Sequence, residues 1–393
     1  MSKFDPSSLL VARSLAADEG AIIRMAVKSR ELRAAGRDVV SLTVGEPDFD
    51  TPENIQVAAT RAMKAGFTHY SPTQGIPELR SALSHKLKIE NNLDYAASEI
   101  CMTNGAKQAI ANAVLAIIDH GDEVIMLAPF WVSYDIIVRF AGGTSVVLPA
   151  SVEENYKVPA ARIAAAVTTR TKLLILNSPC NPTGAVWTRA ELEEIAAIVR
   201  AHPQMMVLAD EIYEYILFEG EMVSIGSLPE MRERTITVNG FSKGFAMTGW
   251  RLGYAAAPAP IARAITVMQS IITTGANQFV QRAAIAALEG PRDSVEAMRK
   301  RYQSRRDMVI AGLSMIKGLR IAPIPATFYA FPDVSRILGA RTTDQLCDWL
   351  LEEHGVATVP GSAFGAPGSI RLSFAASEAD IEKALGRLRE AFA

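Results

Sequence analysis

Short apolar runs alternate with helix-length amphipathic segments between about residues 53 and 290. The runs lie at 123–127, 144–148, 172–176, 205–209, 235–238 and 252–257. Each is apolar throughout rather than at every second position, which is typical of buried, mostly parallel strands covered by helices on both faces. The pattern therefore predicts a large α/β domain with a mostly parallel central sheet.

The character of the chain changes after residue 290. A long charged helix is expected at about 293–316, followed by "FYAFPDV", another helix, "GVATVP", "SIRLSF" and a last helix beginning at "SEAD". This order suits an antiparallel or mixed sheet with helices on one side, that is, a smaller α+β domain. A chain of 393 residues also exceeds the size at which a single core stops growing. We expect the segment 1–45 to contribute to the small domain, 46–290 to form the large domain, and 291–393 to form the small C-terminal domain.

Composition excludes several classes of function. The formal net charge is −2 and the chain has no basic run, so we expect no nucleic-acid partner. Three cysteines without a CxxC pair and five histidines without an HExxH spacing argue against a disulfide framework and against a metal site. The first residues lack the apolar stretch of a signal peptide, and no run approaches the ~18 apolar residues of a membrane span. We expect a cytoplasmic protein with no membrane partner.

Reactive side chains follow three of the apolar runs. Asn181 lies in the stiff loop "NSPCNPTGAV", Asp210 and Tyr213 lie in "DEIYEY", and Lys243 lies in "NGFSKG". Ligands of open α/β sheets bind at the carboxyl ends of the strands, so these side chains should meet.

A second group of residues favours an anion. Gly105, Ala106 and Lys107 stand before a predicted helix, where unpaired backbone amides would face a phosphate. Arg251 and Ser242 could add donors to the same anion.

Together these groups match the needs of pyridoxal 5′-phosphate. Lys243 would carry its aldehyde, Asp210 would keep the ring nitrogen protonated, and Tyr213 and Asn181 would donate to its phenolate. Small neighbours around Lys243 would let the flat ring approach the backbone.

The string "GFSKGFAMTGWRLG" at 240–253 is similar to the lysine signature of the class I pyridoxal-phosphate-dependent aminotransferases. The blocks "GEPDFDTP", "YSPTQGIPELR", "NPTG", "DEIYE" and "VPGSAFG…IRLSF" also stand in that family's order. The chain most resembles the bacterial aspartate aminotransferase subgroup, which includes prephenate and aromatic aminotransferases. The resemblance implies the aspartate-aminotransferase fold (fold type I), with a small domain built from both termini. It also implies a homodimer with composite sites at the subunit interface.

The resemblance assigns further roles. It implies that Lys243, Asp210 and Tyr213 are catalytic, and that Arg371 in "IRLSF" grips the substrate α-carboxylate. Trp131 matches the aromatic residue stacked on the pyridine ring. Gly45 and Asn181 also match substrate-binding positions, and Tyr70 matches a tyrosine that reaches the partner subunit's cofactor phosphate.

The implied reaction is a two-stage transfer of an amino group from an amino acid to a 2-oxo acid. We expect aspartate or glutamate with 2-oxoglutarate as substrates, with Lys107 reading the distal carboxylate because "VMQSIITTGANQF" has no arginine. The segment 17–25, "ADEGAIIRM", departs from the "PSAT" sequence of many relatives and is expected to line the substrate entrance. An aromatic or prephenate aminotransferase and a C–S lyase of the same fold stay open as alternatives. A non-catalytic binding module is a third, less favoured alternative.

Overall fold

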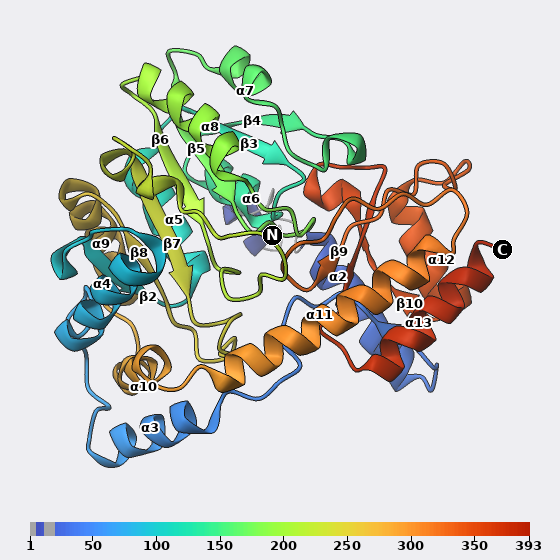
Figure 1. Ribbon diagram of the computed structural model, residues 1–393, viewed down its shortest axis with the longest axis horizontal. Helices are drawn as coiled ribbons and strands as arrows, with labels where there is room; N and C mark the ends of the chain where they lie inside the picture. The colour runs from blue at the N-terminus through green and yellow to red at the C-terminus, as the bar shows by residue number, and fades with distance from the viewer. Residues whose placement is uncertain (1–4, 12–19) are drawn as a thin grey trace.

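A seven-stranded sheet forms the centre of the larger part of the molecule (Figure 1). The computed structural model describes residues 5–11 and 20–393. The strand order is β2-β8-β7-β6-β5-β3-β4. The strands are β2 (Ile100–Thr103), β3 (Glu123–Ala128), β4 (Thr144–Pro149), β5 (Thr171–Asn177), β6 (Met206–Asp210), β7 (Thr235–Gly240) and β8 (Gly253–Ala256). The five strands from β4 to β7 in this order are parallel, as the sequence predicts.

Both faces of the sheet are buried. Successive side chains of a strand point to opposite faces, so neighbouring residues of one strand pack in different clusters. Val124 and Met126 of β3 pack in one hydrophobic cluster and Ile125 between them packs in another. The first cluster is closed by α5 (Ala106–Ile117) and α9 (Ala259–Thr273), and the second by α7 (Ala160–Ala166) and α8 (Arg189–Ala201). This double burial explains why the runs are apolar throughout.

Three details of the sheet differ from the sequence-based expectation. β2, which no apolar run predicted, forms the edge beside β8. β8 is antiparallel to both of its neighbours, β2 and β7. β4 is the opposite edge strand and its side chains are only partly buried, so its apolar run does not mark an interior strand.

The C-terminal part forms two small sheets. A three-stranded antiparallel sheet has the order β11-β12-β9, built from Val359–Pro360, Ile370–Ser373 and Tyr329–Ala330. A second pair joins β1 (Val40–Ser41) to β10 (Val356–Ala357) in parallel, so the N-terminal part of the chain lies beside the C-terminal part. The helix α2 (Gly20–Ala34) precedes β1, and residues 1–4 and 12–19 of the predicted N-terminal segment lie outside the described residues.

The long helix α11 (Asp293–Ser314) runs from the larger part toward the C-terminal helices (Figure 1). It packs against the last helix, α13 (Glu378–Ala391), which begins after an N-cap at Ser377. The remaining helices are α3 (Glu53–Lys64), α4 (Pro77–Asn91), α6 (Ser133–Phe140), α10 (Gln278–Glu289) and α12 (Thr343–His354). The 3₁₀ helices are η1 (Pro6–Leu9), η2 (Ala97–Glu99), η3 (Val152–Glu154), η4 (Ile225–Ser227), η5 (Arg232–Arg234) and η6 (Gly361–Phe364).

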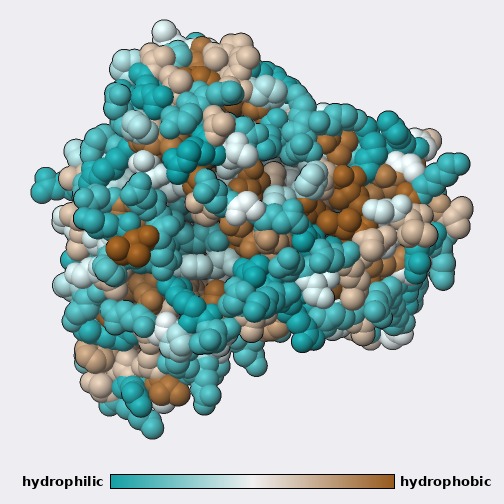
Figure 2. Space-filling view, in the orientation of Figure 1, coloured by the Kyte–Doolittle hydropathy of each residue, from teal (hydrophilic) through white to brown (hydrophobic). Residues whose placement is uncertain are grey.

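Hydrophilic residues cover most of the face seen in Figure 2, and hydrophobic residues gather mainly over the C-terminal part of the chain on the right. Within residues 5–11 and 20–393, no helix combines the length and the apolar character needed to cross a membrane. The same residues contain no group of three or more His, Cys, Asp or Glu side chains arranged to hold a metal ion.

Candidate active site

A cavity of about 320 Å³ lies at the carboxyl ends of the parallel strands. Asn177 and Asp210, the last residues of β5 and β6, both line it and pair with each other across the two strands. Eleven of the residues predicted from the sequence line the same cavity: Gly45, Ala106, Lys107, Trp131, Asn181, Asp210, Tyr213, Ser242, Lys243, Arg251 and Arg371. Parallel strands bring their carboxyl ends to one edge, which explains why side chains distant in sequence converge here.

Lys243 follows β7 and is half-buried at the cavity wall. Its Nζ donates a hydrogen bond to the backbone oxygen of Gly45 at 2.6 Å. Burial lowers the pKa of this amine to about 8, although the nearby Glu46 carboxylate acts in the opposite direction. The lowered pKa increases the population of the neutral amine, which is both a nucleophile and a base, so Lys243 is suited to react with an aldehyde.

Asp210 presents a buried carboxylate to the cavity. Tyr134 Oη donates to Asp210 Oδ2 at 2.6 Å, and the Ile212 backbone N–H donates to Oδ1 at 3.3 Å. Burial raises the pKa of Asp210 to about 6, against the effect of the Tyr134 hydrogen bond. The carboxylate is therefore ionised near neutral pH and can accept a proton-bearing nitrogen.

Arg371 is a buried guanidinium, only 1% exposed, on β12. Its Nη1 donates to Asn181 Oδ1 at 3.1 Å and its Nη2 donates to the Thr43 backbone oxygen at 2.6 Å. It has no carboxylate partner within the described part of the chain, and its Nε has no hydrogen-bond partner there. A buried cation without an anion is unfavourable, so this arrangement is suited to an anionic ligand.

A second cationic corner lies where α5 begins. Arg251 donates to the backbone oxygens of Thr248 at 3.0 Å and Asn104 at 3.4 Å, which holds its guanidinium over the helix start. Gly105 does not line the cavity, but a Cβ there would lie 2.5 Å from Arg251 Nη2. A Cβ at Gly253 would lie 2.4 Å from the Ala106 backbone nitrogen. Glycine at both positions keeps the helix amides and Arg251 close together, as a phosphate group requires.

Lys107 lines the cavity with its side chain exposed to solvent. Its Nζ lies 4.9 Å from the centre of the Trp131 ring, and no carboxylate pairs with it within residues 5–11 and 20–393. The cavity therefore has cations at Arg371, Arg251 and Lys107.

Tyr70 does not line the cavity of its own chain. Its side chain is 89% exposed. The next residue, Ser71, donates from Oγ to the Ala276 backbone oxygen at 2.9 Å, which places Tyr70 beside the segment after α9. The expected role of Tyr70 in a partner's site therefore stays a prediction.

Sequence reasoning missed several residues that line the cavity. Tyr134 lies three residues after Trp131 and its backbone N–H donates to the Trp131 oxygen at 3.0 Å, so this turn spacing could have placed it beside the predicted aromatic residue. Tyr329 carries no comparable signal, because it comes from a C-terminal segment that folds over the sheet. Ile22 also lines the cavity and belongs to the segment 17–25, which the sequence predicts to line the substrate entrance. Residues 17–19 of that segment lie outside the described residues.

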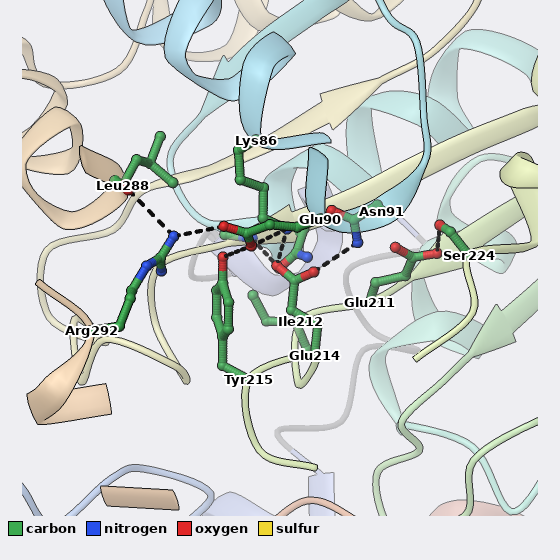
Figure 3. A network of polar contacts seen from close by, with 12 residues as sticks. Lys86, Glu90, Asn91, Glu211, Ile212, Glu214, Tyr215, Ser224, Leu288 and Arg292 are labelled. Carbon is green, nitrogen blue, oxygen red and sulfur yellow. Dashed lines mark hydrogen bonds and ion pairs between the residues drawn. The ribbon is translucent and has the colours of Figure 1, made fainter. Parts of the chain in front are cut away.

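A polar network surrounds Glu214 and Tyr215, which follow Asp210 and Tyr213 in the chain (Figure 3). Glu214 accepts from Lys86 Nζ at 2.5 Å and from Asn91 Nδ2 at 2.9 Å. Tyr215 Oη donates to Glu90 at 2.6 Å, and Arg292 donates to the other oxygen of Glu90 at 3.0 Å.

Glu211 lies beside this network and accepts from Ser224 Oγ (Figure 3). Burial raises the pKa of Glu211 to about 8, against the effect of that hydrogen bond, so it holds a proton at neutral pH. At neutral pH Glu211 therefore adds no negative charge beside Asp210.

The donor set fits pyridoxal phosphate. The cavity combines an amine of lowered pKa at Lys243, an ionised carboxylate at Asp210, a glycine-lined helix start beside Arg251, and the guanidinium of Arg371, which has no carboxylate partner in the described chain. These are the groups that an aldehyde, a pyridine nitrogen, a phosphate and a substrate carboxylate would each require.

The amino-acid sequence is similar to those of known transaminases over most of its length. It is 42% identical over 372 residues to an aspartate/prephenate aminotransferase of Cereibacter sphaeroides, covering 92% of this chain and 93% of that protein. It is 45% identical over 369 residues to a bifunctional aspartate aminotransferase and glutamate/aspartate-prephenate aminotransferase of Petunia hybrida, covering 91% of this chain and 77% of that protein.

Solved structures share the fold. The aspartate aminotransferase of Rhizobium meliloti superposes with a TM-score of 0.94 at 38% identity, covering 99% of both chains. That of Thermus thermophilus, solved with maleate, gives a TM-score of 0.93 at 44% identity over 97% of this chain and 99% of that one. A family model for aminotransferases of class I and II matches residues 37–388. The chain therefore belongs to the class I and II aminotransferases, as its motifs predict, and is a pyridoxal-phosphate-dependent transaminase of fold type I.

Proposed function

We propose that this transaminase moves the amino group of aspartate or glutamate to a 2-oxo acid such as 2-oxoglutarate. The observation that carries the proposal is the pair of available cations in one cavity, Arg371 and Lys107, neither of which has a carboxylate partner in the described chain. A dicarboxylic substrate offers one carboxylate to each. The names of the relatives, which include aspartate and prephenate, support a dicarboxylic substrate class.

Each cofactor contact is proposed from the chemistry of the side chain. Asp210 would accept a hydrogen bond from the protonated pyridine nitrogen, and the Trp131 ring would stack on the pyridine. Arg251, Ser242 and the amides of residues 105–107 would hold the phosphate. When bound, pyridoxal phosphate supplies an aldehyde that links to an amine and a ring that accepts electrons from the substrate α-carbon.

Asn181 would contact both cofactor and substrate. Its Oδ1 accepts from Arg371 Nη1, so its Nδ2 is the atom left to donate into the cavity. Tyr213 would donate its phenolic proton to the cofactor's phenolate oxygen.

Lys243 would move the proton of the reaction. Its pKa, lowered to about 8, makes the neutral form of Nζ far more populated at neutral pH than that of an ordinary lysine. Once displaced from the cofactor, this nitrogen would take the proton from the substrate α-carbon and give it to the former aldehyde carbon of the cofactor within the same stage. Arg371 would hold the α-carboxylate of the substrate. The Gly45 backbone oxygen, which accepts a hydrogen bond from Lys243 Nζ, would hold this amine in position.

The proposed active form is a homodimer. Apolar side chains are exposed on α9, where Val267 is 48%, Ile271 72% and Ile272 50% exposed, and Tyr70 lies beside the end of this helix. An exposed apolar surface of this kind supports association with a second copy. Three free, buried cysteines are consistent with a reducing compartment and support a cytoplasmic location.

A Lys107→Met substitution tests the proposed substrate class. Loss of a charged hydrogen-bond donor should lower kcat/KM for aspartate roughly 10- to 100-fold while leaving that for phenylalanine little changed. The matched control is Lys88→Met, which removes an exposed lysine of α4, 61% exposed, far from the cavity lining. Equal losses with aspartate and phenylalanine would remove Lys107 from substrate recognition.

A further inference from the structure

Tyr329 links the small sheet to the proposed cofactor contacts. It lies on β9, is 1% exposed, and lines the cavity. Its partner across the strands is Ser373, so Arg371, two residues earlier on β12, lies on the same face of the sheet. The Arg371 guanidinium carbon lies 4.6 Å from the centre of the Tyr329 ring.

The Tyr329 hydroxyl has a fixed place. Tyr329 Oη lies 3.0 Å from Tyr213 Oη, and both side chains are buried. A Cβ on Gly45 would lie 2.0 Å from Tyr329 Oη, so the hydroxyl rests directly against the backbone that accepts from Lys243. Because the two phenols form one hydrogen bond, only one of them is the donor.

We propose that Tyr329 is a positioning residue whose hydroxyl donates to the Tyr213 oxygen and so directs the Tyr213 proton into the cavity. The inference rests on the proposed function, in which Tyr213 donates to the cofactor's phenolate oxygen. A phenol that donates to the cofactor can still accept a hydrogen bond at its oxygen. A chain of two hydrogen bonds in one direction strengthens the second, because each donor polarises the next.

The surroundings of the two rings support this direction. Burial raises the pKa of both phenols, so both keep their protons. The Arg371 cation lies against the Tyr329 ring and is the main influence opposing burial there; it also lowers the pKa of Tyr213, where its effect is smaller than that of the neighbouring Tyr329. A phenol beside a cation is the stronger donor, which makes Tyr329 the natural donor of the pair. The same contact joins the proposed substrate-carboxylate site at Arg371 to the proposed cofactor contact at Tyr213.

The test is an absorbance titration of the resting holoenzyme without substrate. Its pH midpoint reports the proton held between the Lys243 nitrogen and the cofactor's phenolate oxygen. A donor to the phenolate stabilises the deprotonated form and lowers the midpoint. Tyr213→Phe should therefore raise the midpoint, and Tyr329→Phe should raise it by a smaller amount, roughly half a pH unit. The double variant should show the midpoint of Tyr213→Phe alone, because Tyr329 acts through Tyr213.

Tyr156→Phe is the matched control. It also removes a buried hydroxyl that makes hydrogen bonds, to Phe331 O at 3.0 Å and Ser369 Oγ at 3.1 Å, but Tyr156 does not line the cavity. This variant should keep the wild-type midpoint. Thermal unfolding of each apoenzyme should show that Tyr329→Phe and Tyr156→Phe both fold, so a shift confined to Tyr329→Phe is not a general loss of packing.

The outcomes separate the inference from the function on which it rests. If Tyr213→Phe raises the midpoint but Tyr329→Phe lowers it or leaves it unchanged, the inference is wrong while the role of Tyr213 stands. A lowered midpoint would mean that Tyr213 donates to Tyr329 in the wild type. Additive shifts in the double variant would also overturn the inference, because Tyr329 would then act independently. If Tyr213→Phe itself leaves the midpoint unchanged, the proposed contact of Tyr213 fails and the inference fails with it.

Discussion

A buried lysine, Lys86, and the half-buried Lys243 differ in what surrounds their amines. Lys86 Nζ lies 2.5 Å from the Glu214 carboxylate and also donates to Asn91 Oδ1, so its charge is balanced. Lys243 Nζ donates to a backbone oxygen, and the cations Arg371 and Arg251 counteract the effect of the carboxylates Glu46 and Asp210 on it. The first lysine is suited to hold structure together and the second to react.

The lowered pKa of Lys243 gives a pH dependence that can be measured on the apoenzyme. The neutral fraction of its amine rises with pH through about 8, so labelling by acetic anhydride should rise between pH 7 and 9 and then level off. A lysine-containing peptide, with an ordinary pKa near ~10.4, should continue to rise above pH 9. Peptide mass spectrometry gives the extent of labelling at Lys243. A Lys243 labelling profile that follows that of the peptide would contradict the lowered pKa of Lys243.

The residue scale also shows what the sequence could predict. Lys243, Asp210 and Asn181 were predictable because each lies at or just after the end of a parallel strand, and the carboxyl ends of such strands share one edge. Tyr329 reaches the cavity from a two-residue strand of another sheet. Its contact with Tyr213 depends on how the small sheet packs on the large one, which no local pattern contains.

At the scale of elements, α4 is anchored to the turn that carries Asp210 and Tyr213. The anchor is the pair of Lys86 and Glu214, whose side chains are 4% and 6% exposed (Figure 3). The ring of Tyr215 in the same turn packs on Gly244, where a Cβ would lie 2.6 Å from Tyr215 Cδ2. The turn therefore connects α4 with the backbone directly after Lys243.

Lys86→Met should destabilise the protein strongly. It leaves the Glu214 carboxylate buried without its cation, and breaking such a pair costs about 3–5 kcal/mol. Lys88→Met on the same helix is the control, because the Lys88–Asp94 pair is 61% and 77% exposed and should change stability by less than about 0.5 kcal/mol. Urea unfolding of both apoenzymes gives the comparison. Equal stabilities of the two variants would show that the network does not anchor the turn.

The sequence predicted the strands of the large sheet better than it predicted their positions within the sheet. Six strands of the large sheet were predicted from apolar runs, because burial on both faces leaves a continuous signal. β2 was missed because its four residues, ICMT, are too short and too mixed to stand out. β4 carries an equally apolar run but is an edge strand. Its position in the sheet was not predictable, because the sequence of one strand does not say which strands pair with it.

At the scale of the whole molecule, the proposed composite sites can be tested by mixing inactive subunits. If Tyr70 acts in the partner's site, Tyr70→Ala and Lys243→Ala proteins are each impaired alone, but a mixed dimer contains one site with both native residues. After denaturation and refolding together, random pairing should restore roughly a quarter of wild-type activity. Activity no higher than the mean of the two separate variants would place Tyr70 in its own subunit's site or outside any site.

The measurement that tests the central claim most directly is a single half-reaction with each amino acid. The holoenzyme is mixed with one amino acid and no 2-oxo acid, and the 2-oxo acid released is counted against subunits. A dicarboxylate transaminase should release one equivalent of 2-oxo acid per site from aspartate or glutamate, release no ammonia, and stop until 2-oxoglutarate is added. Conversion by aromatic amino acids alone, or continuous release of pyruvate and ammonia from cysteine-like substrates, would contradict the account.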